Sequence, residues 1–237
     1  MKVVLLRVAI DTGSGGIHGP LFPDGSFEYV PIPDGFGIDE RTYGNTIGRC
    51  GKRLVEYFPP ARHARMSSQS IHFDPEFATY TYGDPSVPKG TLRYLEPGDM
   101  LIFYCGLQGW GFDSDPALYL LGYFEVQAAA RAIEFSRVQL DSLFGENFHV
   151  RHPEVFASQR ERLVLVKGGP GSRLLTRAVR ISDVGRTYSG KPLKVLSSEM
   201  QAIFGGFDGR IGIQRSSLRW VHPDSVERAA ELLRSIE

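Results

Sequence analysis

The 237-residue chain has no net charge, only two cysteines and no long hydrophobic run. Cys50 and Cys105 are far apart and form no Cys-x-x-Cys pair, which argues against a structural zinc site or a disulfide framework. No run approaches the roughly eighteen apolar residues that a membrane-spanning helix needs. The opening MKVVLLRVAID also lacks the apolar core of a signal peptide. We therefore expect a reduced, cytoplasmic chain without membrane contact.

Several catalytic motifs are absent as well. The chain has neither G-x-x-x-x-G-K-[ST] nor a clean G-x-G-x-x-G, which argues against a nucleotide P-loop or a dinucleotide fold. It also lacks G-x-S-x-G and Ser-x-x-Lys, so the common serine-nucleophile arrangements do not apply. Whatever chemistry the chain performs must come from a less standard set of side chains.

The hydrophobic pattern indicates an α+β fold. Hydrophobic residues make up 42% of the chain and charged residues 23%, which is ordinary for a globular protein with a sizeable core. Apolar runs of strand length predict strands at residues 2–9, 27–32, 100–105, 117–126 and 162–167. Helical spacing predicts helices at 197–204 and 223–236, whereas 133–144 fits either a helix or a strand with a helical turn. We expect a single domain over residues 1–237, with a curved, barrel-like mixed sheet and flanking helices.

Charge is distributed unevenly along the chain. Residues 1–144 carry 12 basic and 17 acidic side chains, and residues 145–237 carry 15 basic and 10 acidic ones. The basic C-terminal half is therefore either a phosphate-binding face or an exposed surface without a partner.

The loop DTGSGG follows the first predicted strand. Asp11 stands where a strand opens into a loop, a frequent position for catalytic or metal-binding carboxylates, but also for an Asx turn. The hydroxyl of Ser14 and the backbone of Gly15 offer a nest for an anion or substrate. Both interpretations of the loop remain open.

His72 and Asp74 lie in the segment HFDP. Alternate positions of an extended segment share a face, so the imidazole and the carboxylate point the same way. They predict a general acid/base pair or, with Asp11 or Asp34, a nitrogen- and oxygen-donor site for an ion such as Mn, Fe or Mg. The alternative is a pair that only stabilises the turn before Pro75.

Two more histidines, His149 and His152, lie in HVRHP close to Asn147. On one helical turn they converge on a ligand; in an irregular loop before Pro153 they remain surface groups.

The loop YCGLQGWG contributes three candidate substrate-binding side chains. Tyr104 and Trp110 are candidates for stacking on a base, and Gln108 for reading a base edge, although aromatic loop residues also serve as lids over a core.

The turn KGGPGSR contributes three further candidates. Lys167, Ser172 and Arg173 suit a phosphate contact, with a plain glycine turn as the alternative.

A family resemblance runs through most of the chain. The segments MKVVLLRVAIDTGSGG, PLFPDGS, VPIPD, HFDPEF, LEPGDMLIFY, LLGYFEV, FHVRHPE and RLVLVKGGPGSRLL resemble, in this order, the nucleotide-modification-associated domain, type 3, family. The chain resembles a divergent member, because the region before GDMLIFY lacks the glycine-rich, glutamine-bearing segment of phage and bacterial members. The resemblance implies a role in modifying nucleic-acid bases. A weaker resemblance, in GDMLIFY and LGYFEV, is to the strand pair of PUA-like barrels, which bind RNA or extruded bases.

The combined expectation is a nucleic-acid-associated protein that recognises, and as an enzyme modifies, a DNA or RNA base. In that hypothesis Asp11, His72 and Asp74 supply the chemistry, the aromatic loop holds an extruded base and the basic half binds phosphates. The alternatives are a non-catalytic reader of modified nucleic acid and an enzyme of a free nucleotide. The sequence identifies no cofactor.

Overall fold

The computed structural model describes residues 1–207, 210–214 and 217–236. Its main element is an eight-stranded mixed sheet whose principal path runs in the order β12-β1-β6-β7-β8-β5. The strands of this path are β1 (Val3–Arg7), β5 (Thr81–Asp84), β6 (Met100–Gly109), β7 (Ala117–Arg131), β8 (Val164–Gly168) and β12 (Arg219–Trp220). β2 (Gly19–Leu21) pairs with the end of β6, and β9 (Arg173–Arg180) pairs with β7. β1 and β2 run parallel to β6, and the other pairings are antiparallel.

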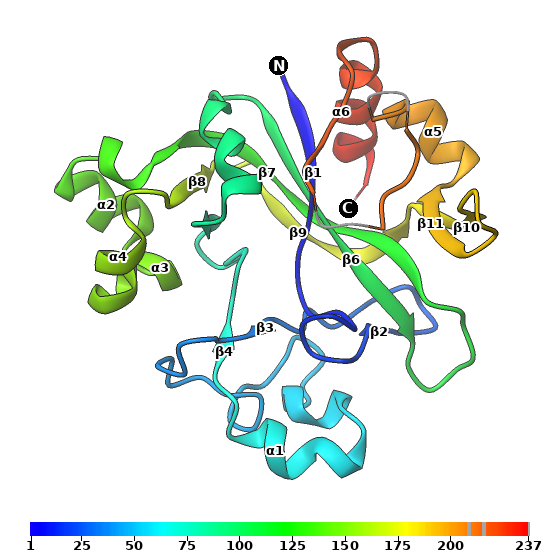
Figure 1. Ribbon diagram of the computed structural model, residues 1–237, viewed down its shortest axis with the longest axis horizontal. Coiled ribbons are helices and arrows are strands. Elements are labelled where there is room, and N and C mark those ends of the chain that lie inside the picture. Colours follow the sequence, from blue (N-terminus) through cyan, green and yellow to red (C-terminus); the bar gives the residue numbers. More distant parts are fainter. Residues whose placement is uncertain (208–209, 215–216, 237) are drawn as a thin grey trace.

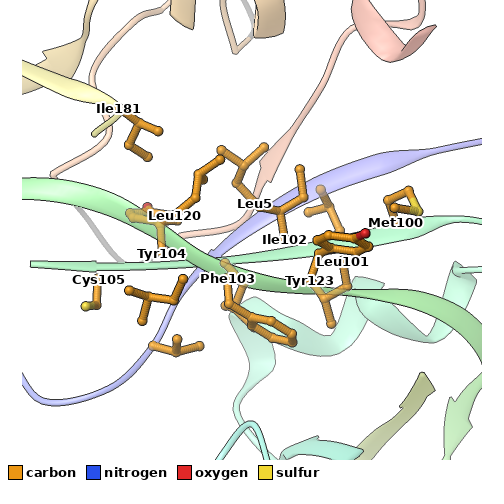
Figure 2. Close-up of a cluster of buried hydrophobic side chains, with 14 of the residues drawn as sticks. Leu5, Met100, Leu101, Ile102, Phe103, Tyr104, Cys105, Leu120, Tyr123 and Ile181 are labelled. Carbon is orange, nitrogen blue, oxygen red and sulfur yellow. The ribbon is translucent and has the colours of Figure 1, made fainter. Parts of the chain in front are cut away.

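The hairpin of β6 and β7 forms the centre of the sheet. Every residue from Met100 to Leu107 is buried, because chain packs against both faces of β6. Figure 2 shows Tyr104 and Leu120 on one side of the sheet, and Phe103 and Cys105 on the other. The prediction of two strong strands joined by a long loop is confirmed.

The sheet bends along β7. Residues 117–125 of β7 pair with β6, while residues 126–131 pair with β8, and the register shifts near Gly122 and Val126. A Cβ on Gly122 would lie 2.4 Å from the carbonyl oxygen of Arg173, so only glycine permits this close approach of β9. β7 thus continues from the part of the sheet that contains β6 into the part that contains β8 and β5.

Helices and two small sheets surround the large one (Figure 1). The small sheets pair β3 (Ile32–Pro33) with β4 (Ile71–His72) and β10 (Ser182–Arg186) with β11 (Pro192–Leu196). The α-helices are α1 (His63–Ser67), α2 (Arg137–Phe144), α3 (Phe148–Arg151), α4 (Pro153–Gln159), α5 (Ser198–Phe204) and α6 (Val226–Ser235). Short 3₁₀ helices are η1 (Leu54–Tyr57), η2 (Pro60–Arg62), η3 (Val87–Tyr94), η4 (Ala132–Glu134) and η5 (Pro223–Ser225). None of the helices in the described ranges is long and apolar enough to span a membrane.

Two segments and the closure of the sheet differ from the simplest expectation. The ambiguous segment 133–144 contains η4 and then α2, which begins after the N-cap Ser136. The predicted strand at 27–32 is wrong: among these residues only Phe27 forms a bridge, and Ile32 belongs to β3. Pro31 and Pro33 lack the backbone N–H that a longer ladder requires. The sheet is mixed as expected, but its main path ends at β12 and β5 within the described ranges, so closure into a barrel is not confirmed.

Candidate functional site

His72 and Asp74 enter the site from β4 and the residues that follow it. The side chain of each is buried. One carboxylate oxygen of Asp74, Oδ1, accepts a hydrogen bond of 2.9 Å from the backbone N–H of Gly83 in β5. This bond fixes the carboxylate and leaves its second oxygen, Oδ2, directed toward other groups.

His149 reaches the same place from α3. Asn147 caps this helix by accepting from the backbone N–H of His149 at 3.1 Å, and its own amide donates to Thr81 Oγ1 at 3.2 Å. The ring Nδ1 of His149 lies 2.6 Å from the amide oxygen of Gln159 at the end of α4. An amide oxygen only accepts, so Nδ1 carries a proton. In the neutral imidazole, Nε2 therefore offers its lone pair.

The three side chains form one compact cluster. One donor atom each from His72, Asp74 and His149 lies within 4.8 Å of the other two. His149 Nε2 is 3.7 Å from Asp74 Oδ2, and the rings of His72 and His149 are 4.7 Å apart, edge to face. The Nε2 atoms of both histidines are buried and have no hydrogen-bond partner among the described residues. Burying such nitrogens unpaired is costly unless something else binds them.

Burial and proximity set the protonation of the cluster. Burial lowers the pKa of His72 well below its usual range, so this ring is neutral near pH 7. Burial raises the pKa of Asp74 to about 6, against the opposing effect of His149. Burial alone lowers the pKa of His149, but the Asp74 carboxylate and Gln159 outweigh it and raise the pKa. The raised pKa of Asp74 brings its carboxyl closer to neutral pH, where a group can act in acid–base catalysis.

A charged network around Asp39 includes Arg151 of α3, the helix that also carries His149. Asp39 is buried and accepts from Arg41 Nη2 at 3.1 Å and from Arg151 Nη2. Burial raises the pKa of Asp39, but hydrogen bonds and charges from these arginines outweigh burial and hold it below its usual value. His152 Nε2 lies 3.7 Å from the same carboxylate, so it belongs to this network and not to the cluster.

Phe148 separates the network from the cluster. Its ring centroid is 4.0 Å from that of His72 and 5.0 Å from that of His152. The side chain is fully buried, so it fixes the position of the His72 ring by packing alone.

One cavity reaches the cluster. It has a volume of about 370 Å³, and we call it the Asp74 cavity. Its lining comprises Arg7, Val8, Ala9, Asp11, Gly13, Ser14, Ile32, Asp74, Tyr82, Asp84, Ser86 and Lys89. Asp74 is the member of the cluster that lines this cavity; His72 and His149 do not line it. Ala9, two residues after the end of β1, has a positive φ of 60°, a strained conformation for a residue other than glycine.

Asp11 both caps its own loop and lines this cavity. It accepts from the backbone N–H groups of Gly13 at 2.6 Å and Ser14 at 3.0 Å. It also pairs with Arg7 at 3.2 Å. Asp11 and Ser14 line the Asp74 cavity, but His72 does not, so Asp11 shares a cavity with one member of the cluster without joining it. Asp34 instead caps the loop before Asp39.

A second cavity adjoins the first at the Arg7–Asp11 pair. It has a volume of about 530 Å³, and we call it the Lys194 cavity. The two cavities have Arg7, Asp11 and Gly13 in common. The charged and polar groups of the Lys194 cavity include His18, Lys194 and Gln214, and the ring Nδ1 of His18 is buried without a hydrogen-bond partner among the described residues.

The three candidate residues of the predicted aromatic loop lie in different surroundings. Tyr104 is fully buried in β6, and its hydroxyl donates to the carbonyl oxygen of Ile213 at 3.2 Å, so its ring belongs to the core. Trp110 packs edge to face on Tyr57, with ring centroids 5.2 Å apart. Gln108 is exposed and lines a further cavity with Trp110. Only Gln108 and Trp110 are accessible for a ligand there.

The predicted phosphate-binding turn has intramolecular contacts. Lys167 Nζ donates to the carbonyl oxygen of Thr79 at 2.5 Å. Ser172 is buried and accepts from the backbone N–H of Glu125 at 3.1 Å, which joins the turn between β8 and β9 to β7. Arg173 lies 5.8 Å from the centre of the Tyr123 ring and is exposed. Gly15 lies in the loop capped by Asp11, where its carbonyl accepts from Arg62 at 3.3 Å.

Comparison with models of known protein families identifies one family that matches nearly the whole chain. The model of nucleotide modification associated domain 3 matches residues 2–231. The chain belongs to this family. No curated protein and no solved structure shows significant similarity to the chain. This match confirms the resemblance and indicates that the chain is involved in nucleotide modification.

Several residues that contact the site or its neighbouring network were not predicted from the sequence. Asp39, Arg41 and Gln159 support it, and none of them stands in a recognisable motif. Arg151 lies between the two predicted histidines, and its charge beside HPE was an available signal.

Proposed function

We propose that this domain is an enzyme that modifies a base of a nucleic-acid strand, with its chemistry at His72, Asp74 and His149. The observation that carries the proposal is the burial of two unpaired imidazole nitrogens beside a carboxylate, next to a cavity. Such an arrangement costs folding free energy that an apolar replacement would avoid. In a member of a nucleotide modification family, chemistry on a substrate is the function that makes use of it.

The Asp74 cavity suits the base. Its wall contains the carboxylates of Asp11, Asp74 and Asp84, together with Arg7 and Lys89, and thus has no surplus of positive charge. A mixture of hydrogen-bond donors and acceptors suits the edges of a base better than it suits a phosphate. A base inside a duplex cannot reach a buried carboxylate, so the substrate is a single strand or an extruded nucleotide.

The Lys194 cavity suits the phosphate beside that base. Arg7, His18 and Lys194 contribute positive or ionisable groups, and only Asp11 opposes them. The pKa of His18 is lowered by burial and by Arg7, so this ring is a neutral hydrogen-bonding group near pH 7. Since Arg7 lines both cavities, it lies at the point where a base and its phosphate would meet.

Exposed cations outside the two cavities favour a nucleic-acid strand over a free nucleotide as the substrate. Lys194 itself lies on β11, which pairs with β10. The exposed basic side chains of β9, β10 and the turn after β10 are Arg173, Arg177, Arg180, Arg186 and Lys191. Exposed cations of this kind can bind the phosphates of several nucleotides without reading their sequence.

Nucleosides from producing cells test this proposal, because the cell supplies any co-substrate. DNA, RNA and the free nucleotide pool are isolated separately and digested, and the nucleosides are compared by mass spectrometry. Wild-type protein is expected to give a new nucleoside mass that is absent with His149→Ala, while the exposed control His222→Ala retains it. A new mass in the nucleotide pool alone indicates a free nucleotide as substrate. Strand binding without any new mass indicates a reader and contradicts the enzyme.

A further inference from the structure

We propose that His72, Asp74 and His149 form a binding site for one divalent first-row transition-metal ion. The candidate donors are Nε2 of each histidine and Oδ2 of Asp74. Two imidazole nitrogens and one carboxylate oxygen are a donor set for Fe(II), Mn(II), Co(II) or Zn(II); Mg²⁺ and Ca²⁺ prefer oxygen alone. The link between such an ion and base modification rests on the function proposed above, whereas metal binding itself does not.

The size of the cluster fits an ion. One donor atom from each residue lies within 4.8 Å of the other two. A point between three such atoms is at most about 2.8 Å from each, and an ion bound to histidine and aspartate needs about 2.0–2.2 Å. Side-chain movements of about 0.8 Å or less per donor close this difference. The site therefore needs no rearrangement of β4 or α3.

The surrounding hydrogen bonds leave the donors of His149 and Asp74 free. Gln159 holds the opposite ring nitrogen of His149, and the Gly83 N–H holds the opposite oxygen of Asp74. Metal sites use such outer contacts to fix the tautomer and orientation of their ligands. The same contacts here direct Nε2 and Oδ2 to a common point.

An ion pair between His149 and Asp74 explains less of the geometry than a bound metal ion does. The 3.7 Å between His149 Nε2 and Asp74 Oδ2 exceeds the range of a hydrogen bond. His72 Nε2 is buried, only 9% of the residue is exposed, and it has no hydrogen-bond partner in the described ranges. An ion satisfies all three groups at once.

The position of the ion relative to the cavity has a chemical consequence. Three protein ligands leave coordination positions open, as catalytic metal sites require. Asp74 lines the Asp74 cavity and His72 and His149 do not, so Asp74 is the ligand that would link the ion to a base bound there in the proposed function.

Metal binding to the purified, folded full chain tests the inference. The protein is treated with a chelator and dialysed against Mn(II), Co(II), Zn(II) or, without oxygen, Fe(II), and bound metal is counted by mass spectrometry. We expect one ion per chain and a Co(II) absorption spectrum that indicates nitrogen and oxygen ligands. His72→Ala and His149→Ala are expected to weaken binding at least 100-fold, and Gln159→Ala about 10- to 100-fold.

Two controls keep the result interpretable. His222→Ala removes a histidine whose side chain is 64% exposed and should bind as wild type does. Circular dichroism establishes that each variant folds; where an alanine variant does not fold, Asp74→Asn and Gln159→Ala take its place. Binding of none of the four metals at one ion per chain overturns the inference, as does binding that these variants leave unchanged.

The outcome is separable from that of the proposed function. A chain that binds no metal but still yields a new nucleoside supports the acid–base enzyme and refutes the metal site. A chain that binds one ion through the cluster but yields no new nucleoside supports the metal site and refutes base modification.

Discussion

Gly83 lies directly against His149: a Cβ added to Gly83 would be 2.7 Å from Cδ2 of the imidazole. The same glycine donates its N–H to Asp74. The absence of a side chain at this one position of β5 thus allows His149 and Asp74 to meet. This contact connects three separate segments of the chain at the site.

Gly83→Ala is expected to displace the His149 ring and widen the cluster. The added methyl group meets a buried ring and the Asn147 amide oxygen at 3.1 Å, so we expect a loss of about 1–3 kcal/mol in the free energy of unfolding. Metal affinity should fall at the same time. Chemical denaturation and metal dialysis measure the two effects. Gly90→Ala is the matched control, because a Cβ there meets nothing within 4 Å. Unchanged metal affinity in Gly83→Ala would contradict the role given to this contact.

Asp39→Asn is expected to destabilise the protein in a pH-dependent way. It removes the charge that Arg41 and Arg151 share, at a cost of about 2–3 kcal/mol at pH 7. The pKa of Asp39 is depressed in the fold, so its contribution is present above the unfolded value of 3.8 and lost as the pH falls through the folded value. The difference in stability between wild type and variant should therefore shrink below about pH 4. Urea unfolding at several pH values measures it, and a pH-independent difference would refute the explanation.

Arg7→Ala and Lys194→Ala are expected to weaken binding of a single-stranded oligonucleotide. Each removes a cation from the Lys194 cavity, so the slope of log affinity against log salt concentration should fall by about 0.7 for each phosphate that the variant no longer neutralises. Arg137→Ala is the control, since its side chain is 76% exposed on α2 and pairs only with Asp141 among the described residues. Fluorescence anisotropy at several salt concentrations gives the slopes. Equal slopes for wild type and both cavity variants would exclude this cavity from phosphate binding.

Tyr104→Phe is expected to affect stability and not ligand binding. Removing the hydroxyl ends one buried hydrogen bond to Ile213, worth about 1 kcal/mol. Thermal unfolding should detect the change, while oligonucleotide affinity should equal that of wild type. Reduced affinity at unchanged stability would restore Tyr104 as a residue that touches the ligand.

The strands of the fold could be predicted from the sequence where consecutive apolar residues are buried in a β-ladder. The runs that became β6 and β7 are apolar at consecutive positions because both faces of these strands are covered. The segment 27–32 was wrongly predicted as a strand because its apolar residues are buried without forming a β-ladder. Phe27, Tyr29 and Val30 are buried by irregular chain, and apolar residues alone do not distinguish this from a ladder.

The site could be read in part. The spacing of His72 and Asp74 in an extended segment predicted a shared face, and both belong to the cluster. Their third partner was not foreseeable, since His149 joins them through the packing of α3 on β5. His149 and His152 looked equivalent in sequence, but the short α3 turns one to Asp74 and the other to Asp39.

The most direct test of the central claim is whether His72 and His149 act as one unit. The amount of modified nucleoside is measured in cells that produce wild type, His72→Ala, His149→Ala and the double variant at equal levels of folded protein. Residues of one centre are not additive, so we expect each single variant to reduce the product to background and the double variant to reduce it no further. Single variants that retain wild-type yield would contradict the account.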